Sequence, residues 1–275
     1  MTKLTVKTWI EKQAQYGKIA FTLDDLKRAF PTAEPTALKS GLYRACRRKE
    51  VAIAWQGFYL ILPLEYRGVG NMPPSEYIDK LMCYLGKPYC VALLNAAAIY
   101  GAAHQRPMNY VIMTSNPPPR CKVQGNVKID FIAKRTFTQG IPSELVKRVK
   151  TQYSSINVTT PEFTALSLVQ YAHAAGGLSH VLTVLEELVE SCRFDQLPSV
   201  LWQHIPLACF QRLGYMLERL LGEQDSADKL YAAVHDSGRL TQKIELSPGS
   251  SAYKGGYDDK WKVYVNIQLE SDIDD

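Results

Sequence analysis

The spacing of apolar residues near the start of the chain predicts three short helices. The first covers residues 3–16, and a short apolar link, residues 19–21, follows it. The second covers residues 23–30, because Thr22 is a good N-cap and two aspartates lie in the first turn, where the helix dipole favours negative charge. A third helix, residues 35–49, begins with a proline in its first turn.

Two strands of a hairpin are predicted directly after the third helix. Residues 51–55 and 58–62 are rich in β-branched and aromatic side chains, and they flank the turn Gln56-Gly57. Three short helices followed by a hairpin are typical of a winged helix-turn-helix. We therefore predict a DNA-binding domain over residues 1–62.

Helical phase divides the third helix into an apolar face and a polar face. The apolar face is expected to pack on the first two helices and holds Leu38, Leu42, Ala45 and Cys46. The candidate DNA-binding residues lie on the polar face and its flanks, and one further candidate, Gln56, lies in the turn of the hairpin. The full set is Thr36, Lys39, Ser40, Tyr43, Arg44, Arg47, Arg48 and Gln56. The alternative interpretation is an ordinary solvated helix face, but the cations at the end of the helix are not balanced by acids along it.

A turn-rich segment, residues 63–75, predicts a linker to a larger second domain over residues 76–275. Here the apolar pattern predicts helices over residues 76–85, 89–100, 161–174, 178–191, 197–203 and 207–221, with Ser75 and Thr160 as the caps of the first and third. It predicts strands over residues 109–115, 122–124, 127–133 and 260–267. The expected fold class is therefore helix-rich α+β, with an N-terminal winged helix-turn-helix and a larger mixed domain.

The net charge of +5 is unevenly distributed along the 275 residues. Residues 1–62 hold 11 Lys/Arg and 5 Asp/Glu, a net charge of +6, whereas the rest of the chain holds 21 and 22 and ends in an acidic tail. A basic segment joined to a neutral remainder is typical of a module that binds a polyanion. No apolar run approaches the about 20 residues that span a bilayer, and the start of the chain has no signal-peptide pattern, so we expect a cytoplasmic protein without a membrane partner.

Known catalytic and metal-binding motifs are missing from the sequence. It contains no phosphate-binding loop, dinucleotide fingerprint, H-E-x-x-H zinc motif or nucleophile elbow, and its five histidines are scattered. The six cysteines form no C-x-x-C pair and are expected to be small buried apolar residues in a reducing compartment: Cys46, Cys83, Cys90, Cys121, Cys192 and Cys209. The sequence therefore predicts a protein that is not an enzyme and needs no metal or cofactor.

Five segments in a fixed order resemble the AbiEi family, the antitoxins of type IV (abortive infection) toxin–antitoxin systems. They are YCVALLNAAAIYGAAHQRP at 89–107, NYVIMTS at 109–115, INVTTPEFTALSLVQYAHAAGGL at 156–178, QRLGYMLERLL at 211–221 and IELSPGSSAYKGG…KWKVYVN within 244–266. In the family, the Thr-Pro-Glu stretch often continues with Lys-Thr and an acidic residue. This chain has Phe163, Thr164 and Ser167 there, so no charge-dependent role is carried over to these positions.

The resemblance implies a specific function. Such antitoxins repress their own operon by binding inverted repeats in the promoter, and their C-terminal domain neutralises a nucleotidyltransferase-like toxin encoded alongside, without requiring a stable complex. The main alternative is a ligand-responsive winged-helix regulator, which would need a deep apolar pocket in its C-terminal sensor domain. A nucleic-acid-modifying enzyme is a third possibility, but it would need a cluster of acids or metal ligands.

Overall fold

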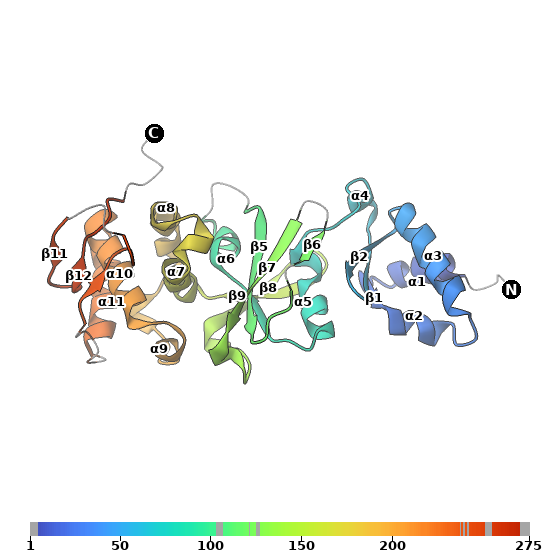
Figure 1. The fold of residues 1–275 in the computed structure, drawn as a ribbon, viewed down its shortest axis with the longest axis horizontal. Helices are drawn as coiled ribbons and strands as arrows, with labels where there is room; N and C mark the ends of the chain where they lie inside the picture. Colours follow the sequence, from blue (N-terminus) through green and yellow to red (C-terminus); the bar gives the residue numbers. More distant parts are fainter. Residues whose placement is uncertain are drawn as a thin grey trace.

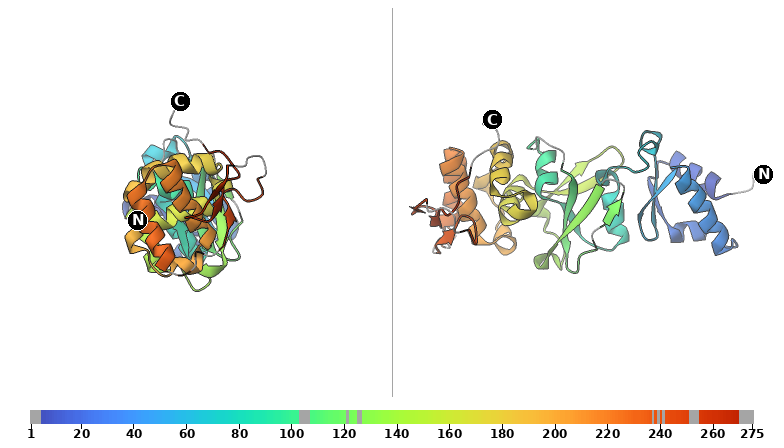
Figure 2. Two further views of the ribbon diagram at one scale, coloured as in Figure 1. Left: turned by 90° about the vertical axis from the view of Figure 1, so that its left-hand side faces the viewer. Right: turned by 45° about the horizontal axis from the view of Figure 1, so that its top comes forward.

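Three groups of elements follow one another along the long axis of the molecule (Figure 1). The structure is a computed structural model that describes residues 5–102, 107–120, 122–124, 127–236, 238, 240, 242–250 and 255–269. An N-terminal helical group lies at one end, a six-stranded sheet lies in the middle, and a C-terminal helical group lies at the other end. Figure 2 shows the same order from a second side. The fold is helix-rich α+β, as predicted.

The first group, called here the N-terminal unit, consists of residues 5–62. Its elements are α1 (Val6–Gln15), β1 (Ala20–Thr22), α2 (Leu23–Ala29), α3 (Pro35–Arg47), β2 (Val51–Trp55) and β3 (Phe58–Ile61). The three predicted helices and the hairpin are therefore present in the predicted order. The prediction of a plain apolar link at residues 19–21 is wrong in part, because Ala20 and Phe21 belong to β1. This strand pairs antiparallel with β3 and completes a sheet in the order β1-β3-β2.

The start of α2 is fixed by the side chains that the sequence indicates. The Thr22 hydroxyl accepts a hydrogen bond from the backbone N–H of Asp25, and an Asp25 carboxylate oxygen accepts one from the backbone N–H of Thr22 at 2.8 Å. This reciprocal pair satisfies two backbone donors that a helix start leaves without partners. In α3, Pro35 occupies the first turn, where its missing N–H is not needed.

The central sheet is mixed and has the strand order β6-β7-β5-β4-β9-β8. Its strands are β4 (Tyr89–Val91), β5 (Asn109–Ser115), β6 (Lys122–Gln124), β7 (Val127–Lys134), β8 (Val146–Lys150) and β9 (Ser155–Thr159). Helix α5 (Pro74–Tyr84) packs on the face towards the N-terminal unit, whereas α6 (Leu93–Ile99) and α7 (Pro161–Gln170) pack on the face towards the C-terminal group (Figure 1).

Two predictions for this region are wrong, and one hairpin was not predicted. Residues 89–91 form a strand and not the start of a helix, because Tyr89 and Val91 pack towards α5 while Cys90 packs on the opposite face of the sheet. That alternation has a period of two and fits a strand. The N-cap of α5 is Pro73 and not Ser75. The hairpin of β8 and β9 has no counterpart among the predicted elements.

The C-terminal group is mainly helical. It contains α8 (Leu178–Leu188), α9 (Leu201–His204), α10 (Leu207–Tyr215), a π-helical turn (Met216–Leu220) and α11 (Gln224–Asp236). The predicted late strand is present only as the two-residue β12, in a small sheet of β10 (Ile244–Glu245), β11 (Tyr257–Asp258) and β12 (Val263–Tyr264). Short 3₁₀ segments lie between the longer elements at Arg135–Phe137, Ser143–Leu145, Ala172–Ala175, Val189–Ser191 and Phe194–Gln196.

One continuous apolar core joins the N-terminal unit to the central sheet. The β2–β3 hairpin contributes Ala54, Phe58 and Leu60, and α5 contributes Tyr77 and Leu81; all five side chains are buried. The opposite face of the hairpin belongs to a second core, which it shares with α1, α2 and α3. The three-stranded sheet is therefore covered on both faces.

The predicted linker, residues 63–75, has structure of its own. It contains the one-turn helix α4 (Leu64–Arg67), and Met72 within it is buried in the shared core. The Tyr153 hydroxyl, in the turn between β8 and β9, donates a hydrogen bond to the Glu65 carboxylate at 2.6 Å. The linker is thus attached to both of the parts that it connects, and the domain limits at residues 62 and 76 stay a prediction.

A tightly packed glycine in α10 gives the first testable prediction. A Cβ on Gly214 would overlap the ring of Trp261, which is fully buried and donates a hydrogen bond from Nε1 to Glu218 at 2.8 Å. We expect Gly214→Ala to lower the free energy of unfolding by about 1–3 kcal/mol in urea titrations, although alanine favours helix.

Gly68→Ala is the matched control, because Gly68 has helical dihedral angles and nothing lies within 4 Å of the place that a Cβ would take. This variant is expected to be neutral or to gain up to about 1 kcal/mol. Equal effects of the two substitutions would contradict the packing described for Trp261.

Lys134, at the end of β7, is buried and has no acidic partner among the described residues. Its Nζ donates hydrogen bonds to the backbone oxygen of His204 at 2.7 Å and to the Gln170 side chain at 3.1 Å. It also lies 5.3 Å from the ring centroid of Phe163 and 5.6 Å from that of Tyr171. Burial disfavours the charged ammonium and lowers the pKa of Lys134 to about 8.

This buried lysine predicts a pH-dependent stability. Between about pH 8 and the ordinary lysine pKa, the unfolded chain binds a proton that the folded chain does not, so this group makes folding more favourable as the pH rises. The difference in free energy of unfolding between the wild type and Lys134→Met should therefore shift by about 2–3 kcal/mol in favour of the wild type from pH 7.5 to pH 10.5. Urea titrations across this range measure it, and a flat difference would contradict it.

Candidate nucleic-acid interface

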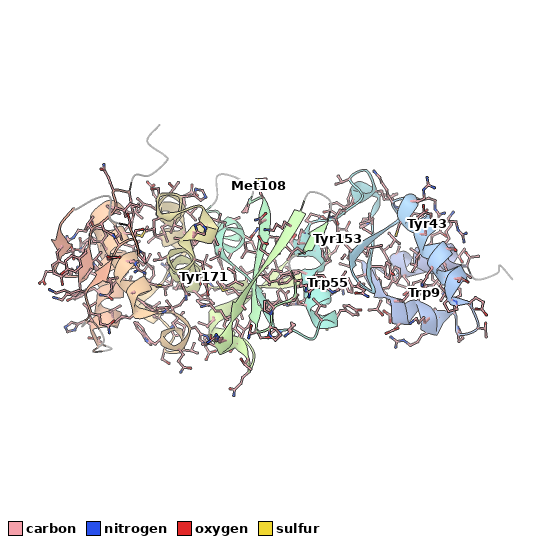
Figure 3. The ribbon with its side chains drawn as sticks, viewed as in Figure 1. Trp9, Tyr43, Trp55, Met108, Tyr153 and Tyr171 are labelled. Carbon is pink, nitrogen blue, oxygen red and sulfur yellow. The ribbon has the colours of Figure 1, made fainter. Side chains whose placement is uncertain are left out.

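Helix α3 lies at the end of the molecule that is remote from the C-terminal group, with one face free (Figure 3). Leu38, Leu42 and Ala45 are buried against α1 and α2, as predicted, and Cys46 is half-buried in the same core. Gly41 permits the close approach of α1, because a Cβ there would meet the Val6 side chain at 2.7 Å. The packed side of α3 determines which side remains exposed.

The predicted candidate residues on α3 are all exposed. They are Thr36, Lys39, Ser40, Tyr43, Arg44 and Arg47. Tyr43 is 62% exposed, and the Arg47 guanidinium lies 6.0 Å from the centroid of its ring. Lys39, Arg44 and Arg47 form no ion pair with any described residue. We refer to these six residues as the α3 face.

Arg48 differs from the cations of the α3 face because it is already paired. Its Nε and Nη2 atoms each donate a hydrogen bond to Glu50 at 2.9 Å, in a two-point contact. This contact raises the pKa of Arg48 and lowers that of Glu50. A guanidinium held in this way has fewer donors for a phosphate or a base edge, which makes Arg48 the weakest of the predicted cationic candidates.

Gln56 lies at the hairpin turn and not on α3. Its side chain is exposed, but its backbone oxygen accepts a hydrogen bond from the Tyr84 hydroxyl of α5 at 3.1 Å. A Cβ on the neighbouring Gly57 would lie 2.7 Å from the same hydroxyl. The turn is therefore packed against α5. Tyr84 was not identified from the sequence, because its contact with Gln56 joins residues 28 positions apart.

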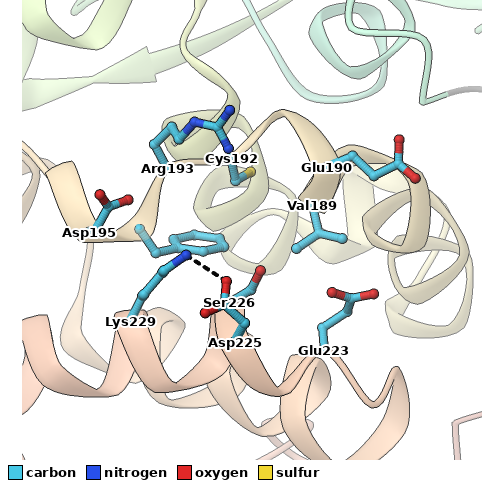
Figure 4. A pocket seen from close by; sticks show the side chains of 10 residues that line it. Val189, Glu190, Cys192, Arg193, Asp195, Glu223, Asp225, Ser226 and Lys229 are labelled. Atoms are coloured by element: carbon cyan, nitrogen blue, oxygen red, sulfur yellow. Dashed lines mark hydrogen bonds and ion pairs between the residues drawn. The ribbon is translucent and has the colours of Figure 1, made fainter.

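The C-terminal region has a small cavity of about 200 Å³ between the segment after α8 and the start of α11 (Figure 4). Charged side chains of both signs dominate its lining, among them Glu190, Arg193, Asp195, Glu223, Asp225 and Lys229. Lys229 is already paired with Asp225. Val189, Cys192 and Phe194 also line the cavity, but most of the lining is charged, whereas a sensor pocket is expected to be mainly apolar.

The described residues contain no group of three or more His, Cys, Asp or Glu side chains that could hold a metal ion. The five described cysteines are free, and three of them are buried as predicted. The predicted burial is wrong for Cys83, which is exposed, and Cys46 is only half-buried. Within the described residues, no helix is long and apolar enough to cross a membrane. Cys121 and residues 103–106 lie outside the described residues.

Three residues after Thr-Pro-Glu differ from the usual pattern of the resembled family, and all three lie in the protein interior. Phe163, Thr164 and Ser167 are all fully buried in α7. The Thr164 hydroxyl lies 2.7 Å from the backbone oxygen of Thr160, and the Thr160 hydroxyl accepts a hydrogen bond from the backbone N–H of Phe163. An unpaired charge at any of these three positions would be costly in this interior.

The fold defines an α+β protein in which a three-helix unit with a small sheet precedes a mixed six-stranded sheet and a helical group. Residues 89–219, from β4 into the π-helical turn after α10, match the family model of the AbiEi antitoxin C-terminal domain. This part of the chain therefore belongs to the AbiEi antitoxin C-terminal domain family. It contains the first three of the resembling segments and most of the fourth, whereas the segment within 244–266 lies outside the match.

A solved structure has a similar fold over nearly the whole chain. It is the crystal structure of the RV2827C protein from Mycobacterium tuberculosis, with a TM-score of 0.64 and 15% sequence identity. The match covers 92% of this chain and 88% of that one, so it includes elements outside the family model. At this identity the likeness shows a shared fold and nothing more. No curated protein matches the sequence.

Proposed function

We propose that this protein is a cytoplasmic, non-enzymatic antitoxin that also represses its own operon. In this proposal the N-terminal unit is a winged helix-turn-helix that binds inverted repeats in the promoter. The remainder of the chain neutralises a nucleotidyltransferase-like toxin encoded alongside, with or without a stable complex. The AbiEi antitoxin domain at residues 89–219 supports the antitoxin role.

The observation that carries the DNA-binding half is the α3 face. It offers three cations without ion-pair partners among the described residues, two hydroxyls and one aromatic ring on a single exposed side of a helix of 13 residues. A helix of this kind fits the major groove, where cations reach phosphates or guanine and hydroxyls reach either. The net charge of +6 on residues 1–62 favours the same partner.

A ligand-responsive regulator remains the second candidate. It would share the DNA-binding half and differ in the role of the C-terminal region. The charged cavity described there gives it little support. A test of toxin neutralisation distinguishes the two candidate functions, because a ligand-sensing domain is not expected to relieve growth arrest caused by a toxin.

Single substitutions on α3 test the DNA-binding half. We expect Arg44→Ala and Arg47→Ala each to weaken binding to a promoter fragment by about 1–3 kcal/mol if the side chain reaches a base edge, which corresponds to a rise in Kd of about 5- to 150-fold. Fluorescence anisotropy of the labelled fragment measures this at fixed salt.

Arg48→Ala is the matched control, because the same charge is removed from a side chain that Glu50 already holds. We expect it to have a clearly smaller effect. If all three variants bind as tightly as the wild type, the α3 face is not the interface.

Co-expression tests the antitoxin half. The chain, expressed from an unrelated promoter, should relieve the growth arrest caused by the toxin encoded next to it. The double variant Arg44→Ala/Arg47→Ala should relieve it equally well, because the substituted side chains lie outside residues 89–219. Growth arrest that persists with the wild-type chain would contradict the antitoxin role.

A further inference from the structure

A second cavity, of about 240 Å³, lies where the N-terminal unit meets α5. It is called here the junction cavity. Its lining comes from α1, the segment from Lys18 through β1, the first turn of α2, and α5: Trp9, Gln13, Lys18, Ile19, Ala20, Phe21, Asp25 and Lys80. The two parts of the chain that the shared core joins therefore both contribute to this cavity.

The inner wall of the junction cavity is apolar and aromatic. Trp9, Ile19 and Phe21 are 8%, 3% and 4% exposed, and the Trp9 and Phe21 rings meet edge to face with centroids 5.1 Å apart. Phe21 in turn stacks on Tyr59 of β3, with centroids 5.3 Å apart. These contacts fix the rings, so the wall is preformed and suits a planar apolar group.

Most polar groups of the junction cavity are donors with no ion pair or hydrogen bond to a described residue. Lys18 and Lys80 are exposed and form no ion pair with a described residue, and no hydrogen bond to a described residue is found for the Gln13 amide or the Trp9 Nε1. These groups come from different elements and converge on one small volume.

The one carboxylate of the lining, Asp25, is already engaged. It accepts hydrogen bonds from the Thr22 backbone and hydroxyl at 2.8 and 2.7 Å and from Arg28 at 2.7 Å. Hydrogen bonds from Thr22 and the nearby Arg28 charge hold its pKa below the ordinary value despite some burial. The Lys18 charge also helps to lower this pKa, so Asp25 partly balances Lys18. The two lysines and the one carboxylate still leave the lining with one excess positive charge.

We propose that the junction cavity is a binding site for a small aromatic carboxylate. The ring would lie against Trp9 and Phe21, and the carboxylate would accept hydrogen bonds from Lys18 and Lys80. The size favours a ligand of one or two rings, because drug-sized ligands occupy pockets of about 300–1,000 Å³. Such a ligand would bridge α1 and α5, and it would contact β1, which leads directly into the N-cap of α2.

Calorimetric titration of the full chain with benzoate, without DNA, tests the proposal. We expect saturable binding at one site per chain with a Kd of about 1 mM, as befits a ligand of few atoms. The neutral isostere benzamide should bind at least about tenfold more weakly. Because no DNA or toxin is present, this result is independent of the proposed function.

Two double variants of equal charge identify the site. Lys18→Gln/Lys80→Gln should raise the Kd for benzoate by at least about tenfold. Lys12→Gln/Lys150→Gln, which changes two exposed lysines outside the lining, should leave it unchanged. The absence of saturable benzoate binding to the wild type, equal Kd values for the two double variants, or benzamide binding as tight as benzoate binding would each overturn the proposal.

Discussion

The packing of the β2–β3 hairpin between two apolar cores is the constraint on which the rest of the structure depends. One face of the hairpin is buried against the three N-terminal helices, and the other is buried against α5 and the central sheet. A sheet covered on both faces cannot rotate against either neighbour without exposing apolar surface, at about 25 cal/mol for each Å². The direction of the α3 face is therefore set by the central sheet as well as by its own unit.

This constraint divides the surface of the N-terminal unit into occupied and free parts. The hairpin turn is held by Tyr84, and the following segment is held by Tyr153, so these parts are engaged within the chain. The α3 face remains free at the end of the molecule. In the proposed repressor, DNA recognition would therefore rest mainly on α3. The β2–β3 hairpin would chiefly attach the N-terminal unit to α5 and the central sheet.

Much of the N-terminal unit could be predicted from sequence because its signals are local. The Thr22 cap and the helical phase of α3 each depend on residues a few positions apart. The strand at Tyr89–Val91 could not be predicted in this way, because a short apolar run fits a buried strand and a buried helix equally well. The site shows the same division: exposure of the α3 face followed from helical phase, whereas the contact between Gln56 and Tyr84 joins residues far apart in sequence.

The salt dependence of promoter binding by the full chain tests the central claim most directly. If Lys39, Arg44 and Arg47 are the free cations that meet phosphates, the logarithm of the binding constant should fall with the logarithm of the salt concentration with a slope of about −3 or steeper. Replacing all three residues with glutamine should make that slope shallower by about 3. A slope near zero for the wild type, or the same slope for the triple variant, would contradict the assignment of the α3 face as the DNA-binding surface.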